Sequence, residues 1–250
     1  MKVWINHNPM RNNSRRVGSI ALLLLVLAGG ISPLMAANEP QTVDARLVLY
    51  REQEPGTEPY PVRILVTPDF VRFDDGHNDS DFVLYDRHRQ RITSVVHEDR
   101  SVMEFSAPRQ LTLLGVQRPT INKLIEDDPQ APKIEDLPVK LLSITADGEE
   151  CLHAAVVPGL LPGVVEALAE YHALIEKRNI SELSNTPEEM RTPCYLANQV
   201  FDHGSQYDFG FPVQEAIRDG RSRVLMDYGH QLVGSELFWI PEDYHPYVEE

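Results

Sequence analysis

Residues 62–96, VRILVTPDFVRFDDGHNDSDFVLYDRHRQRITSVV, set the architecture of this chain. They hold four short runs rich in β-branched and aromatic residues, which favour strands. Between the runs stand segments of Pro, Asp, Gly and Arg that are typical of turns. Strands joined by such short connections pair antiparallel. These residues therefore predict an antiparallel meander.

The same pattern continues on both sides of this stretch. A hairpin is expected to turn at Asp147-Gly148, a sequence that favours tight turns. The predicted strands are 45–51, 62–67, 70–73, 82–85, 92–96, 102–105, 139–145, 151–157, 223–228 and 236–240.

Alternation within the predicted strands is imperfect. Val62, Ile64 and Val66 share one face of their strand, whereas Leu65 lies on the other. A sheet with one wet face alternates cleanly between apolar and polar residues. We therefore expect both faces to be covered, by a helix, a second sheet or a lipophilic ligand.

Residues 106–138 form a Pro-rich, acidic connection, with one short strand or turn expected near 111–116. Two interpretations remain open for this connection. It is either a linker between domains or a long loop crossing one sheet, and the small size of the flanking pieces favours the loop.

The clearest helix is predicted from Pro162 to Asn179, because apolar residues recur there at helical spacing and Pro suits a first helical position. Thr186-Pro187 and Thr192-Pro193 are typical of further helix starts, the second continuing to Phe201. Residues 38–250 are thus expected to form a single α+β, β-rich domain. Two or three helices, within an insertion at 158–202, would pack on one face of its sheet.

The first 37 residues predict export. Basic residues precede an apolar run at 17–31, and small residues follow that suit cleavage after Ala36 or Ala37. An uncleaved anchor is the alternative, but the run is shorter than the roughly 20 apolar residues of a spanning helix. We therefore expect a cleavable signal peptide at 1–37, a periplasmic product and no membrane span after cleavage. Either Met1 or Met10 is the start.

Net charge argues against nucleic acid as a partner. The first 37 residues hold four of the 23 basic residues and none of the 38 acidic ones, so their removal leaves a net charge of −19. Such a surface repels phosphate backbones.

Cys151 and Cys194 are the only cysteines in the chain. In an oxidising compartment an isolated pair is best explained by one disulfide, which would stabilise the fold by about 4 kcal/mol for a loop of this length. Two buried free thiols are the alternative.

The sequence predicts no catalytic or metal-binding signature. His77, Asp79 and Asp81 alternate in one loop but lack the spacing of a calcium site, so a polar turn is expected there. No cofactor is expected. Arg87 and Arg89 belong to a basic turn on an acidic protein, which favours a partner contact.

Three segments resemble one family. VTPDFVRFD at 66–74, FVLYDR at 82–87 and ITSV at 92–95, with LFWIPEDY at 237–244, are similar to periplasmic half-barrel proteins of the lipoprotein-carrier (LolA/LppX-like) kind. The resemblance covers about half of residues 38–250. It implies a curved antiparallel sheet with helices against its concave side, where acyl chains are sometimes held.

Two functions are expected from these observations. The first is non-catalytic binding of a lipophilic group, a lipid or the acylated end of a lipoprotein, with Leu65, Phe73 and Tyr85 lining the pocket. The second is an envelope interaction or regulatory protein with a filled core, which acts through protein contacts at Arg87 and Arg89.

Overall fold

A computed structural model describes residues 41–108 and 115–247. The predicted signal peptide lies outside the described residues, as does most of the strand or turn expected at 111–116. Residues 39–250 form one compact unit. No helix among the described residues is long and apolar enough to cross a membrane.

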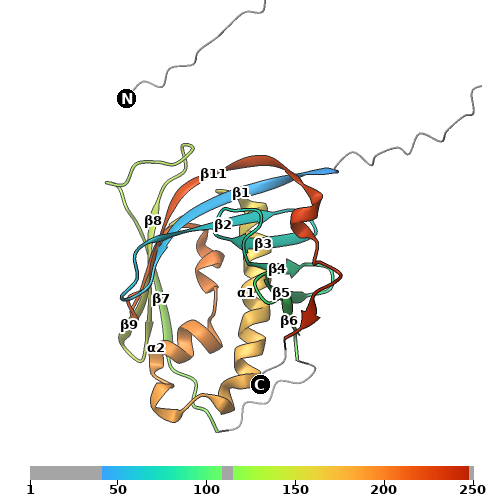
Figure 1. Cartoon of the computed structure of the whole chain (residues 1–250). Coiled ribbons are helices and arrows are strands. Elements are labelled where there is room, and N and C mark those ends of the chain that lie inside the picture. The colour runs from blue at the N-terminus through green and yellow to red at the C-terminus, as the bar shows by residue number, and fades with distance from the viewer. Residues whose placement is uncertain (1–40, 109–114, 248–250) are drawn as a thin grey trace, which may run out of the picture. The chain divides into compact units, whose positions relative to one another are not determined.

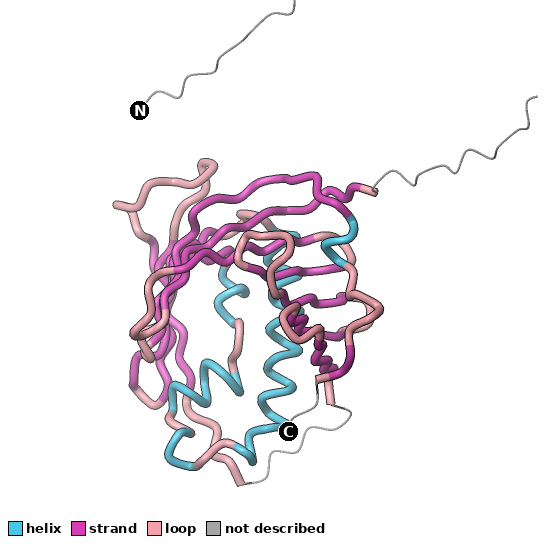
Figure 2. The backbone as a smooth tube through the Cα atoms, in the orientation of Figure 1, coloured by secondary structure: helices cyan, strands magenta, loops and turns pink. Residues whose placement is uncertain are grey.

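One sheet of twelve strands dominates this unit, in the order β12-β6-β5-β4-β3-β2-β1-β11-β10-β9-β8-β7. Neighbouring strands are antiparallel except for the short parallel pair of β12 with β6. Figure 1 and Figure 2 show that the sheet curves around the helices, as the sequence predicted. The strands are β1 (Thr42–Gln53), β2 (Tyr60–Val66), β3 (Phe70–Asp74), β4 (Phe82–Asp86), β5 (Arg91–Val96), β6 (Ser101–Ser106), β7 (Ile121–Asp127), β8 (Lys140–Ala146), β9 (Glu149–Val157), β10 (Phe211–Ile217), β11 (Ser222–Gly234) and β12 (His245–Pro246).

The helical segments follow β9 in the chain. The main helix starts at Pro162, as predicted, after Leu161 in a left-handed conformation. At Thr186-Pro187 only a single 3-10 turn follows, whereas the Thr192 side chain caps the next helix by accepting from the Tyr195 amide at 3.1 Å. These segments are α1 (Pro162–Glu182), η1 (Leu183–Asn185), η2 (Glu188–Met190), α2 (Pro193–Tyr195), η3 (Leu196–Phe201) and η4 (Ser205–Phe209).

Helix α1 lies inside the curve of the sheet (Figure 1). Its Val164 and Leu168 pack with Val48, Ile64 and other buried residues of the inner sheet face. Burial of such aliphatic side chains contributes about 1.5–3 kcal/mol each. The helix therefore fills much of the concave face. It covers one of the two apolar faces that the sequence predicted for these strands.

The outer face of the sheet has a separate core. Leu65, Phe82 and Leu84 pack there beneath Leu237 and Phe238 of the C-terminal segment. The prediction of a strand at 236–240 is wrong, because η5 (Ser235–Phe238) forms a 3-10 turn there. This turn directs two successive apolar side chains onto the sheet, which an extended strand, with alternating sides, does not do.

Between β6 and β7 the chain includes residues 109–114, which lie outside the described residues. It leaves β6, near one edge, and enters β7, the strand at the opposite edge. β7 was not predicted. The stretch 106–138, predicted as a connection, therefore contains a strand of the same sheet as β6 and β8.

Candidate functional site

The three residues expected to line a lipophilic pocket lie on both faces of the sheet. The rings of Phe73 and Tyr85 contact Tyr171 of α1, with ring centroids 4.7 and 5.9 Å apart. Leu65 is fully buried in the outer core. The structure therefore brings Phe73 and Tyr85 together beneath α1 and separates Leu65 from them.

Arg87 and Arg89, the predicted partner contacts, have different surroundings. The Arg87 guanidinium donates two hydrogen bonds of 2.8 Å to the Glu170 carboxylate of α1, so it ties the helix to the turn after β4. Arg89 contacts the Asp86 carboxylate at 3.2 Å, and its side chain is 71% exposed. Of the two, Arg89 is the residue available to a partner.

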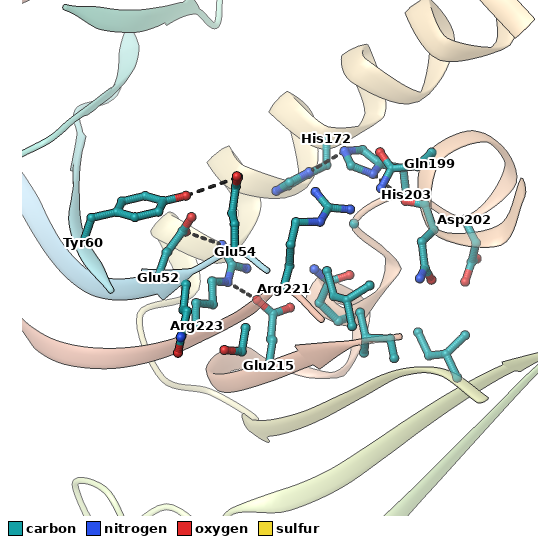
Figure 3. A pocket seen from close by; sticks show the side chains of 18 residues that line it. Glu52, Glu54, Tyr60, His172, Gln199, Asp202, His203, Glu215, Arg221 and Arg223 are labelled. Carbon is teal, nitrogen blue, oxygen red and sulfur yellow. Dashed lines mark hydrogen bonds and ion pairs between the residues drawn. The ribbon is translucent and has the colours of Figure 1, made fainter. Parts of the chain in front are cut away.

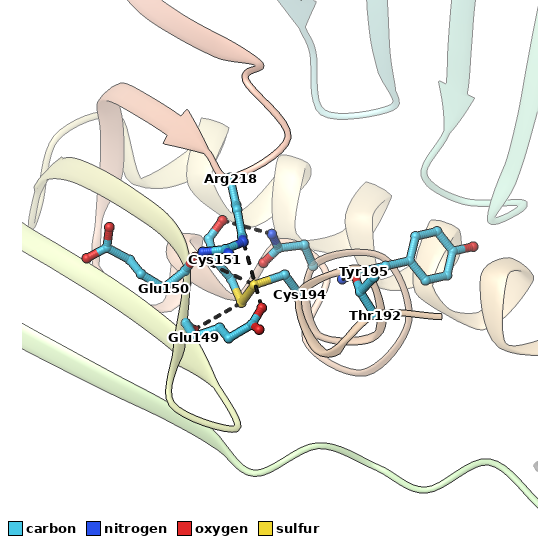
Figure 4. The surroundings of a disulfide bond; sticks show 8 residues. Glu149, Glu150, Cys151, Thr192, Cys194, Tyr195 and Arg218 are labelled. Carbon is cyan, nitrogen blue, oxygen red and sulfur yellow. Dashed lines mark hydrogen bonds and ion pairs between the residues drawn. A yellow bond between two sulfur atoms is a disulfide. The ribbon is translucent and has the colours of Figure 1, made fainter. Parts of the chain in front are cut away.

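A disulfide joins Cys151 of β9 to Cys194 of α2 (Figure 4), as predicted. Their Cα atoms are 5.0 Å apart, within the usual range for a disulfide. Asn198 of η3 donates to the Cys151 carbonyl at 3.0 Å. The bond and this contact fix the start of η3 against the sheet.

The turn containing His77, Asp79 and Asp81 is exposed or nearly so. The Asp81 carboxylate accepts from the His97 amide at 2.7 Å, and Asp75 accepts from the His77 amide at 3.0 Å. Within the described residues, no group of three or more His, Cys, Asp or Glu side chains is arranged to hold a metal ion.

A pocket of about 190 Å³ lies between α1, the η3–η4 segment and the strands β1, β8, β9, β10 and β11 (Figure 3). We call it the inner pocket. Its lining combines several charged side chains and two histidines with a few aliphatic ones. The lining residues are Glu52, Gln53, Glu54, Tyr60, Ile144, Leu152, His172, Asn198, Gln199, Asp202, His203, Gly204, Gln206, Glu215, Ile217, Arg221, Ser222 and Arg223.

Arg223 organises the strand side of the inner pocket. Its Nε forms an ion pair with Oε2 of Glu215, the Nη2 donates to the Tyr207 hydroxyl at 2.9 Å, and the guanidinium lies 4.7 Å from the Tyr50 ring centre. The Glu52 carboxylate is 3.9 Å from Nη1. Burial raises the pKa of Glu52, and Arg223 opposes that rise. One cation thus lies between two carboxylates.

Two histidines form the helix side of the inner pocket. His172 Nδ1 of α1 lies 2.9 Å from His203 Nε2, and His203 Nδ1 lies 2.7 Å from the Asn198 carbonyl. Burial lowers the pKa of His172 well below its ordinary value and also lowers that of His203. Gly204 makes this approach possible, because a Cβ atom there would collide with the His172 side chain.

Sequence reasoning missed this site. Glu215 lies in β10, a strand that was not predicted, and neither His172 nor His203 was singled out in the sequence. The one hint in the sequence was Arg223, a charged residue that begins the strand predicted at 223–228. Its position alone did not show which carboxylates it would meet.

Comparisons with models of known families and with curated proteins find no significant match. Among solved structures, two structures of PNGF-II, in space groups C2 and P21, are similar over 82% of this chain. The identities are 7% and 8%, and the TM-scores are 0.40 and 0.38. The chain spans only 30% and 31% of their length. Because both TM-scores are below 0.5, this similarity is too weak to indicate a fold or an activity.

Proposed function

We propose that this chain is an exported, non-catalytic binding protein whose ligand occupies the inner pocket. The proposal rests on the difference between two parts of the concave face, one apolar and one charged. Helix α1 fills the part beneath it with apolar side chains, whereas the inner pocket beside it gathers charged groups from several elements. A few convergent polar groups in a concave site are typical of ligand recognition.

The proposed compartment is the periplasm. The Cys151–Cys194 disulfide supports it, because disulfides persist in oxidising compartments. The signal peptide expected at 1–37 supports it independently. N-terminal sequencing of the protein recovered from a periplasmic extract tests the assignment, with a start near residue 37 or 38 expected. A protein retained in the cytoplasm at full length would overturn it.

Native mass spectrometry of protein purified from periplasmic extract tests the binding function. We expect a retained small molecule in the wild type. Its occupancy should fall at least tenfold in Gln199→Trp, because an indole at this lining position fills the inner pocket. Gln231→Trp places the same ring on the exposed surface of β11 and is the matched control. Equal occupancy in both variants would contradict the site.

A lipophilic ligand beneath α1 is the second candidate. The observation that favours it is the continuous apolar surface there, where Tyr171 covers Phe73 and Tyr85. Such a ligand must displace α1, which Arg87 ties to the sheet through Glu170. A fluorescent fatty acid should then bind faster to Arg87→Ala than to wild type, with Arg89→Ala as control. Failure of all three proteins to bind it would remove this candidate.

A further inference from the structure

Glu215 presents a hydrogen-bond acceptor that the protein does not use. The residue is 4% exposed, and its Oε2 is occupied by Arg223. Its Oε1 is buried and has no hydrogen-bond partner among the described residues. A buried carboxylate oxygen without a donor is unfavourable. Because Glu215 lines the inner pocket, a ligand bound there lies beside this carboxylate.

The histidine pair presents a second acceptor. A carbonyl only accepts, so His203 Nδ1 carries the proton that is donated to Asn198. In the neutral ring His203 Nε2 is then an acceptor, and the proton between the rings belongs to His172 Nδ1. This assignment leaves a lone pair on His172 Nε2. Figure 3 shows the second ring nitrogen of His172 facing away from His203.

The charged side chains around the inner pocket leave an excess of negative charge. On the strand side Arg223 lies between Glu215 and Glu52, and Arg221 also acts on Glu52 and Glu54. On the other side each charge has its own partner. Asp202 is 2.7 Å from the Lys123 ammonium, and Arg221 is 2.7 Å from the Asp219 carboxylate. Over the whole lining, the four acidic residues Glu52, Glu54, Asp202 and Glu215 exceed the two arginines Arg221 and Arg223 by two negative charges.

We propose that the inner pocket binds a cationic nitrogen group, a protonated amine or guanidinium, between Glu215, Glu52 and His172. This inference rests on the proposed function and names its ligand class. Glu215 Oε1 and His172 Nε2 are both acceptors, so a ligand that complements them is a donor. The excess negative charge selects a cation among donors. A volume of about 190 Å³ is below that of sites for drug-sized molecules, so the ligand is a small amine.

Isothermal titration at neutral pH and low salt tests the ligand class with three probes of similar length. They are 1,4-diaminobutane, butane-1,4-diol and succinate. We expect the diamine to bind at least tenfold more tightly than the uncharged diol, and succinate not to bind. Tighter binding of succinate than of the diamine, or equal binding of diamine and diol, would overturn the inference.

Three variants connect the affinity to the site. Glu52→Gln should weaken diamine binding about tenfold or more, because it removes a charge-assisted acceptor. Glu215→Gln should weaken it further. Circular dichroism checks that this second variant still folds, since Arg223 loses its partner charge, and Glu52→Gln alone suffices if it does not. Glu58→Gln, an exposed position outside the pocket, is the matched control and should bind as wild type. Unchanged affinity in Glu52→Gln would refute the assignment.

Failure of this inference is distinguishable from failure of the proposed function. A natural ligand that is lost in Gln199→Trp, together with no diamine binding, would refute the cationic class and leave the inner pocket as the binding site. No retained ligand and no binding of any of the three probes would refute both.

Discussion

Arg72 and Arg63 share one buried carboxylate, that of Asp74. The Nε atoms of the two arginines lie 2.6 and 2.7 Å from its oxygens. Arg72 is 1% exposed, donates to the Leu237 carbonyl at 2.6 Å and stacks 3.9 Å from the centre of the Phe82 ring. The Asp74 carboxylate is therefore the shared counter-charge of two arginines that are nearly buried.

Asp74→Asn should lower the free energy of unfolding by about 3–5 kcal/mol, because it leaves buried guanidinium groups without their counter-charge. Urea denaturation followed by circular dichroism measures the change. Asp79→Asn makes the same substitution in the exposed turn nearby and should stay within about 0.5 kcal/mol of wild type. A loss at Asp74 no larger than at Asp79 would show that the network does not stabilise the fold.

The sequence predicted a strand at 70–73 that holds Arg72 and ends one residue before Asp74, but it did not predict this network. Arg63 belongs to the neighbouring strand, and it meets Asp74 because β2 and β3 pair in that register. The register follows from the turn between the strands and from packing on both faces. The local pattern of apolar residues does not reveal the strand register. For the same reason the sequence did not predict that Glu215 and Arg223 of the inner pocket would be neighbours.

His172 should make stability depend on pH. Burial holds its pKa in the folded state well below the ordinary value of 6.5. Below pH 6.5 His172 binds a proton in the unfolded chain but stays neutral in the folded chain. The free energy of unfolding is therefore unaffected by this residue above about pH 6.5 and decreases as the pH falls below it. The loss between about pH 7 and pH 5 should be shallower in His172→Phe than in wild type. Thermal unfolding across this range measures it. His230→Phe, at an exposed histidine, should keep the wild-type slope.

Among the elements, those with strong local patterns were predicted and those that depend on a neighbour were not. The strands β2 to β6 lie within two residues of their expected bounds, and α1 starts at Pro162 as expected. β7 is an edge strand that is mostly exposed and pairs with β8, and only Ile121 and Ile125 of its side chains pack on the core, so its apolar pattern is weak. β10 contains Pro212 and a bulge beside it, which concealed its pattern.

The disulfide joins two elements that hold the inner pocket, β9 and the helical segment that continues into η3. Replacing Cys151 and Cys194 by Ala together should lower the free energy of unfolding by about 4 kcal/mol or less, because the open chain gains conformational entropy when it unfolds. Urea denaturation under non-reducing conditions measures the loss. Reduction of the wild type should reproduce it, and reduction should leave the double variant unchanged. An effect of reductant on the double variant would contradict this origin.

In the molecule as a whole, a single sheet separates the apolar cluster beneath α1 from the one beneath the C-terminal segment. The sequence predicted that both faces are covered, from the apolar residues on both sides of the strands around Leu65. It did not show what covers them, because α1 and the C-terminal segment are distant in sequence from the strands on which they pack. The outer core in particular is closed by residues of the last segment of the described chain.

Phe238 and Trp239 provide the test of that closure. Phe238 is 5% exposed and stacks on Phe70 with ring centroids 5.9 Å apart, whereas Trp239 is 63% exposed. Phe238→Ala should lower the free energy of unfolding by about 3–5 kcal/mol, since it opens a cavity over β3 and β4. It should also increase binding of a dye that reports exposed apolar surface. Trp239→Ala removes a larger ring from the adjacent position and should change stability much less. If the two variants lost equal stability, the terminal segment would not be the cover of the outer core, and the sheet would depend on α1 alone.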